Sequence, residues 1–195
     1  MQKLYDFIRR YIDLRDEEVC YLSSHIKTKT FKKGETIHHM GDVFKSIMLI
    51  DKGIARSFII KEDGKDFTWY FHFSNQDSAN LKNFFIVDYA SFTHQEASMM
   101  SFEALQDCEV YVIEHEFLES LYDLDSKWQY LGRVIAQEAY YITHHRTVSL
   151  LTLSASERLN RLMQEYPLIF EHVAHYHIAS FLGIAPQHLS RLRRL

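Results

Sequence analysis

Polar and basic side chains gather near residue 190 of this sequence. Gln187, Ser190, Arg191 and Arg194 are spaced by three and four residues, so on a helix they would share one face. Side chains of these types reach the base edges and phosphates of a DNA duplex. The DNA-contacting residues that we predict are Gln187, His188, Ser190, Arg191, Arg193 and Arg194.

Two short helices joined by a tight turn would position these side chains. Ile178, Ala179 and Leu182 place one face of the first helix inward, and Gly183 permits the left-handed turn that ends it. Pro186 suits the first turn of a second helix, where its missing N–H costs nothing. This order predicts a helix-turn-helix. The alternative is a structural corner between two helices, with a solvated basic end.

The charge of the chain is unevenly distributed. The formal net charge is −4, which argues against wholesale coating of nucleic acid. From Arg146 onward, however, six Arg stand against three Glu, so this part carries +3 and the remainder −7. An acidic body with a basic C-terminal part is typical of a DNA-binding protein with a separate sensing domain.

A long helical pattern precedes the basic part. It runs for almost forty residues after Glu114 with no Pro to interrupt it, and its apolar positions recur every seven residues. We therefore expect a helix that pairs with a second copy, although packing on the protein's own body is an alternative. The predicted dimer interface comprises Leu131, Val134, Glu138, Tyr141, His145 and Val148.

Residues 28–114 have a different pattern, with short β-rich runs separated by turns such as Lys33-Gly34 and Asp63-Gly64. Because no helices separate most of these runs, they predict an antiparallel sandwich or barrel. Residues 4–26 show helical spacing and predict a helical cap on this β-rich domain. Residues 74–95 predict a loop with one helical turn.

A new helix is predicted after residue 153. Ser154 and Glu157 have the spacing of a capping box, and Pro167 would end the helix that they begin. We therefore predict three parts: residues 1–114 as a β-rich sensor domain with its helical cap, residues 115–153 as a dimerisation helix, and residues 154–195 as the helix-turn-helix domain.

Three segments together resemble one known family. They are residues 31–42 (FKKGETIHHMGD), residues 50–56 (IDKGIAR) and residues 178–194 (IASFLGIAPQHLSRLRR), and the order of elements agrees along essentially the whole chain. The sequence is similar to the Crp/Fnr transcription regulators. The resemblance implies an α+β fold with an N-terminal antiparallel β-roll, a jelly roll like that of cyclic-nucleotide-binding domains. It also implies a homodimer that binds double-stranded DNA, with Gln187 and Arg191 facing bases. Ala185 and Pro186 depart from one subgroup of the family, so its operator sequence cannot be transferred.

The resemblance also bears on the effector. Family members that bind cyclic nucleotides hold the phosphate with a Phe-Gly-Glu stretch and an Arg-Ser or Arg-Thr pair. Residues 84–100 contain no Gly, Arg or Lys, and Ser98 and Met99 stand where the Arg pair would be. Because a buried phosphodiester without a cation is heavily penalised, we predict no binding of cyclic AMP or cyclic GMP in the family manner.

An aromatic and methionine-rich pocket would remain in the β-roll. It would suit an apolar effector, and a core simply filled by large side chains is an equal alternative. The residues predicted to line it are Trp69, Phe71, Phe84, Phe85, Tyr89, Ser98 and Met99.

The sequence predicts no cofactor and no metal site. Cys20 and Cys108 have no CxxC partner, and neighbouring His residues such as His38 and His39 point to opposite faces of a strand. Haem is the one exception left open, because some haem-sensing relatives use a β-roll His; His72 and His94 are the candidates.

Enzymatic motifs are absent from the sequence, and we expect a protein that is not an enzyme. No stretch has the length of a membrane span or the pattern of a signal peptide, so a cytoplasmic location is expected. Two rival hypotheses are a cupin-like ligand-binding or enzymatic β-roll, and a sensor that acts through a protein partner without DNA.

Overall fold

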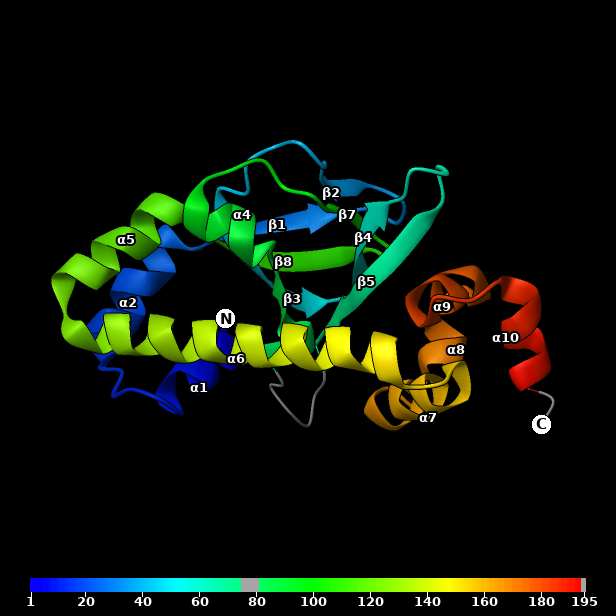
Figure 1. The fold of residues 1–195 in the computed structure, drawn as a ribbon. Helices are drawn as coiled ribbons and strands as arrows, with labels where there is room; N and C mark the ends of the chain where they lie inside the picture. Colours follow the sequence, from blue (N-terminus) through cyan, green and yellow to red (C-terminus); the bar gives the residue numbers. More distant parts are fainter. Residues whose placement is uncertain (75–80, 194–195) are drawn as a thin grey trace.

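The computed structural model describes residues 1–74 and 81–193, without the side chains of residues 81 and 82. Its centre is a β-roll of two four-stranded antiparallel sheets, with one long helix running beneath it (Figure 1). The first sheet has the order β1-β8-β3-β6 and the second the order β2-β7-β4-β5. The strands are β1 (Lys27–Phe31), β2 (Thr36–His38), β3 (Ser46–Lys52), β4 (Ile54–Ile60), β5 (Asp66–Phe73), β6 (Phe85–Ile86), β7 (Ser101–Ala104) and β8 (Cys108–Glu114).

The core of the roll lies between the two sheets. Ile50 and Val110 from the first sheet and Phe102 from the second are fully buried, and the Phe44 and Phe102 rings meet edge to face 5.1 Å apart. Alternating side chains of antiparallel strands face such a core, so the predicted antiparallel β-rich domain is confirmed.

Helices cover one end of the roll. α1 (Gln2–Arg9) and α2 (Asp16–His25) form the predicted N-terminal cap, and they share a hydrophobic cluster with the helices that follow β8. Residues 81–94 contain more structure than the predicted single turn, because two short helices, α3 (Leu81–Phe84) and α4 (Tyr89–His94), flank β6.

The predicted helix after Glu114 is two helices rather than one. α5 (His115–Leu124) ends before Asp125, whose φ of −157° is extended and whose carboxylate caps α6 (Ser126–Thr152) by accepting from the Lys127 N–H. The two helices pack closely where Gly132 meets the Tyr122 ring, since a Cβ at Gly132 would lie 2.5 Å from the Tyr122 hydroxyl. The spacing of seven does not reveal this break, because Asp125 is compatible with one helix or with two.

Four helices follow α6 and lie beyond the end of the β-roll (Figure 1). α7 begins with the predicted capping box, in which the Ser154 hydroxyl and the Glu157 carboxylate each accept from the other's backbone N–H. The helices are α7 (Ala155–Glu165), α8 (Ile169–His172), α9 (His175–Leu182) and α10 (Pro186–Leu192). In the described residues no helix is long and apolar enough to cross a membrane.

Candidate functional site

The α9–α10 pair has the geometry of a helix-turn-helix. Gly183 lies in the left-handed region with φ 68°, and the Ile184 N–H donates to the Ala179 carbonyl at 3.0 Å, which closes the turn. Pro186 occupies the first turn of α10, and Leu189 packs beneath that helix with 1% of its surface exposed. The local structure predicted around these residues is therefore confirmed.

One face of α10 is open to solvent. Gln187, His188, Ser190 and Arg191 are all exposed, and the Ser190 hydroxyl donates to the Pro186 carbonyl one turn earlier. Arg191 extends into solvent from the described part of the helix. These four side chains are therefore accessible to a partner, and their contact with DNA stays a prediction.

The other two predicted contact residues differ from these four. Arg193 lies over the Phe170 ring at 4.3 Å and approaches His175 Nε2 at 3.0 Å, so its guanidinium contacts the helices of its own module. Arg194 lies outside the described residues.

A polar cluster fastens α9 to strand β5. The Ser180 hydroxyl accepts from the Thr68 N–H at 2.8 Å and donates to Asp66, whose carboxylate in turn accepts from Arg56 Nη2 at 2.5 Å. Arg56 also donates to Glu103 at 2.6 Å, although its own side chain is only 4% exposed. Charge-assisted hydrogen bonds of this kind are the stronger class, so the helix-turn-helix is held on the β-roll rather than tethered loosely.

Burial and charge shift the pKa values in this cluster. Burial alone would raise the pKa of Asp66, but the hydrogen bond and charge of Arg56 bring it below its ordinary value. Burial and the nearby Arg56 charge lower the pKa of His177 to about 4. His177 is therefore neutral at pH 7, and its approach to Glu103 at 4.0 Å is not an ion pair there.

Two arginines link α6 and α7 to the C-terminal end of α9. Arg146 of α6 is 7% exposed and donates to the Phe181 carbonyl at 2.5 Å, with its guanidinium 3.7 Å from the Phe181 ring centre. Arg158 of α7 donates to the Leu182 carbonyl at 2.8 Å and to the Leu153 carbonyl at the end of α6. Cations at helix C-termini satisfy free carbonyls and the helix dipole, so these contacts set the orientation of α9 against α6.

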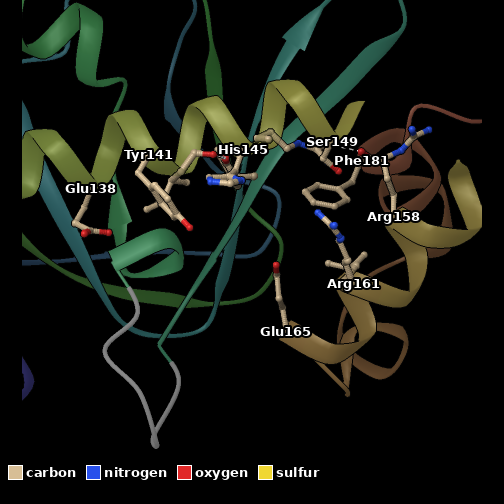
Figure 2. A pocket seen from close by; sticks show the side chains of 12 residues that line it. Glu138, Tyr141, His145, Ser149, Arg158, Arg161, Glu165 and Phe181 are labelled. Carbon is tan, nitrogen blue, oxygen red and sulfur yellow. Dashed lines mark hydrogen bonds between the residues drawn. The ribbon is translucent and has the colours of Figure 1, made fainter. Parts of the chain in front are cut away.

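The two arginines border a crevice of about 320 Å³. Figure 2 shows it open between α6, which supplies His145 and Ser149, and α7, from which Arg161 and Glu165 extend. Burial lowers the pKa of Arg146 to about 10, so its guanidinium stays charged at pH 7. The crevice marks the junction between the β-roll half of the molecule and its C-terminal helices.

The face of α6 predicted to form a dimer interface is mostly exposed. Tyr141 is 59% and Val148 40% exposed, Glu138 and His145 are exposed, and Val134 is half-buried. Leu131 is a correction: it is 7% exposed and packs in the chain's own cluster with α1, α2 and α5. The buried and half-buried stripe of α6 begins against the helical cap and continues beside the β-roll, through Trp128, Leu131, Ile135, Ala139, Ile142 and Arg146.

A cavity of about 240 Å³ lies between the β-roll and α6. Three residues of the predicted pocket, Trp69, Phe85 and Tyr89, line it. Ser98 does not, but its hydroxyl donates at 2.7 Å to Asp88, which does.

The remaining three predicted pocket residues lie elsewhere. Phe71 stacks on Phe181 at 5.2 Å under the C-terminal helices, because it lies between Tyr70 and His72, which line the cavity from the other face of β5. Trp69 joins Tyr70 in the cavity because the β4–β5 register shifts opposite it. Phe84 packs against Phe7 of the N-terminal cap, and Met99 is 76% exposed. These positions are corrections to the predicted lining.

Metal and haem candidates remain sparse. In the part of the chain that the structure describes, no group of three or more His, Cys, Asp or Glu side chains could hold a metal ion. His72 is buried and its Nε2 lies 3.0 Å from the Ser57 hydroxyl, whereas His94 ends α4 on the exterior. Cys20 and Cys108 are both free thiols.

Sequence reasoning missed the buried cations Arg56 and Arg146. A signal for Arg146 was present, since it falls on the same helical stripe as Leu131, Ile135 and Ile142, where a charged residue is unusual unless paired. Arg56 interrupts an apolar strand in a similar way, with Asp66 across the β4–β5 hairpin.

Comparison with known proteins adds to this geometry. Residues 28–125 match the family model for the cyclic nucleotide-binding domain. No curated protein sequence matches the chain. Among solved structures, FixK2 from Bradyrhizobium japonicum superposes with a TM-score of 0.72 at 15% identity, covering 87% of this chain and 83% of that one.

Two further structures are similar over most of their length. A putative Crp/Fnr-family transcriptional regulator from Eubacterium rectale gives a TM-score of 0.69 at 18% identity, covering 93% of this chain and 83% of that one. The c-di-GMP-responsive global regulator CLP from Xanthomonas campestris gives 0.65 at 14%, covering 90% and 88%. At these identities the likeness shows a shared fold, which includes both the β-roll and the C-terminal helices.

Proposed function

This chain belongs to the cyclic nucleotide-binding domain family, and from that premise we propose that it is a homodimeric transcription regulator of the Crp/Fnr type that binds DNA through α10. The observation that carries the proposal is the exposed face formed by Gln187, Ser190 and Arg191 on a helix whose opposite face is buried. The solved structures that share the whole fold include regulators, which favours regulation over the cupin-like enzyme.

Arg191 and Gln187 have distinct roles in this proposal. A guanidinium binds phosphate or the guanine edge with paired hydrogen bonds, and a glutamine amide pairs with the adenine edge. Both side chains are exposed on α10, which lies beyond the end of the β-roll (Figure 1), and in this proposal they enter the major groove. Arg193, held by Phe170 and His175, would support the helix rather than read bases.

The double variant Gln187→Ala with Arg191→Ala is expected to weaken binding to operator DNA by at least about tenfold, because removing a paired hydrogen bond to a base costs about 1–3 kcal/mol. The slope of log affinity against log salt should also become shallower by about one for each phosphate that the variant no longer neutralises. Fluorescence anisotropy with DNA selected by the wild-type protein measures both quantities.

The matched control is Arg9→Ala, which removes the same charge from α1 at the opposite end of the molecule. It should leave affinity within about twofold, since α1 is far from α10. Equal binding by the double variant and the wild type would show that α10 does not contact DNA.

The dimer in this proposal forms along the exposed face of α6. Tyr141 and Val148 are apolar groups on that face, seven residues apart, as expected for a helix that pairs with its symmetry mate. Leu151, 81% exposed, extends the apolar surface by one further turn. Pairing of two α6 helices would place two α10 helices at successive major grooves, about 34 Å apart.

Val148→Asp is expected to raise the dimer dissociation constant by about a hundredfold or more. By two-fold symmetry the substitution places two carboxylates in one interface, and each unpaired buried charge is strongly unfavourable. Light scattering after size-exclusion chromatography, over a range of concentrations, measures the change. Asn160→Asp adds the same charge on the exposed side of α7 and should leave the dimer intact; an unchanged Val148→Asp dimer would place the interface elsewhere.

A further inference from the structure

The cavity between the β-roll and α6 has a lining whose chemistry restricts what it can bind. Strand residues, the segment before α4 and the inner face of α6 all contribute to it. Apolar side chains dominate the lining, four of them with aromatic rings, and its volume of about 240 Å³ is that of a small organic molecule. The lining comprises Ile47, Ser57, Trp69, Tyr70, His72, Phe85, Val87, Asp88, Tyr89, Ala90, Met100, Ile135, Ala139, Ile142 and Thr143.

No cation is available to an anionic ligand in this cavity. Among the described residues that line it, none is Lys or Arg. His72, the remaining basic side chain, is 4% exposed, and burial lowers its pKa to about 4. It is therefore neutral at pH 7. A phosphate or carboxylate entering the cavity would be stripped of its water with no counter-charge to replace it.

Asp88 adds a negative charge to the wall. Its side chain is 8% exposed and accepts hydrogen bonds from the Ser98 hydroxyl at 2.7 Å and the Ser91 N–H at 3.4 Å, the latter as the N-cap of α4. Each oxygen thus accepts one hydrogen bond from the protein itself, so the carboxylate is held in the wall without a ligand. An anion would be repelled by this carboxylate at short range.

The cavity also contacts the helix that leads to the C-terminal module. Ile135, Ala139 and Ile142 of α6 face it, and the Tyr70 hydroxyl donates to the Ile142 carbonyl at 2.9 Å. Arg146, one turn further along α6, holds the Phe181 carbonyl of α9. A molecule in the cavity would therefore press on the same helix that orients the helix-turn-helix.

We propose that this cavity binds an uncharged, largely apolar aromatic molecule and rejects anions, and that such a molecule is the effector of the regulator. The assignment as effector rests on the proposed function; the binding itself does not. The ligand class follows from rings such as Trp69 and Tyr89 around a space with no cation and one engaged carboxylate among its described lining residues.

A pair of fluorescent probes tests the charge selection on the full chain. N-phenyl-1-naphthylamine is uncharged, and 8-anilinonaphthalene-1-sulfonate is the same ring system with one sulfonate added. We expect the first to bind saturably at one site per chain and the second at least about tenfold more weakly, a difference of about 1.4 kcal/mol. Cyclic AMP should not displace the uncharged probe. Equal affinities, displacement by cyclic AMP, or no saturable binding of the uncharged probe would overturn the proposal.

A variant pair locates the site. Ala139→Phe fills the cavity from α6 and should weaken the uncharged probe by at least about tenfold, while Ala136→Phe adds the same ring to α6 outside the lining and should not. Far-UV circular dichroism checks that both variants are folded. If either is not, the comparison of the two probes on the wild-type chain still tests the proposal. Unchanged binding by folded Ala139→Phe would place the probe elsewhere and overturn the assignment of this cavity. These titrations contain no DNA, so a chain that binds the probe but no operator contradicts only the proposed function.

Discussion

Leu182→Ala is expected to lower the free energy of unfolding of the C-terminal module by about 3 kcal/mol and to abolish specific DNA binding. Leu182 is fully buried at the C-terminal end of α9, in a cluster with Ile178 and Leu189 of the helix pair and Phe71 of β5. Truncating this side chain removes buried apolar surface and leaves a void between the two helices. The angle between α9 and α10 depends on that packing.

Urea titration followed by circular dichroism measures the stability change, and anisotropy measures DNA binding on the same samples. Leu168→Ala is the matched control, because Leu168 is 48% exposed and its truncation should cost less than about 0.5 kcal/mol. If Leu182→Ala retained wild-type affinity for operator DNA, the helix pair would not be the unit that binds DNA.

The helix-turn-helix could be predicted from sequence because its decisive signals are local. Few residues other than Gly accept φ near 68°, so Gly183 indicates the turn, and Pro186 shortly after it suits the first turn of a new helix. The capping box at Ser154 and Glu157 is equally local. The antiparallel roll was predicted from short β-rich runs separated by turns such as Lys33-Gly34 and Asp63-Gly64, which are also local signals.

The candidate site was harder to predict because it depends on which faces of the helices and strands pack against each other. A repeat of seven on α6 identifies a helix with apolar stripes, but Leu131 packs on its own chain while Val148 faces solvent. The sequence of α6 does not tell which apolar stripe is buried within the chain and which is exposed, because the docking of α1 and α5 decides it. Phe71 was predicted in the pocket for a similar reason. Alternation gives Trp69 and Phe71 one face of β5, but the register shift opposite Trp69 leaves Trp69 in the cavity and Phe71 against Phe181.

The buried ionic cluster is the least predictable feature and joins the two halves of the molecule. Arg56 lies between Asp66 and Glu103, and Asp66 reaches Ser180 of α9. Next to this contact, Arg146 of α6 holds the end of the same helix. α9 is thus fixed to β5 through Ser180 and to α6 through Arg146 by polar groups with directional contacts, so a small shift of β5 or α6 would be transmitted to α10.

Arg56→Met is expected to lower the free energy of unfolding by about 2–3 kcal/mol at pH 7, because breaking a fully buried ion pair costs about 3–5 kcal/mol and partial solvation reduces that figure. The guanidinium is 4% exposed, whereas the carboxylates of Asp66 and Glu103 are 32% and 24% exposed. Urea titration measures the difference. A cost below about 0.5 kcal/mol would show that the cluster does not hold α9 in place.

The stability difference between the wild type and Arg56→Met should depend on pH, because Asp66 titrates differently in the two proteins. In the wild type the pKa of Asp66 is below its ordinary value, so the stability that it contributes is present at neutral pH and is lost as the pH falls through the folded-state value. In Arg56→Met burial is opposed mainly by the weaker hydrogen bond from Ser180, so that pKa rises and protonation would then stabilise the fold. The gap between wild type and variant should therefore narrow from pH 7 to pH 4. Adding Asp66→Asn and Glu103→Gln to Arg56→Met removes the unpaired charges and should recover stability at pH 7. Two outcomes would contradict the assigned role of the two carboxylates: a stability difference that widens in acid, or a triple variant that is no more stable than Arg56→Met.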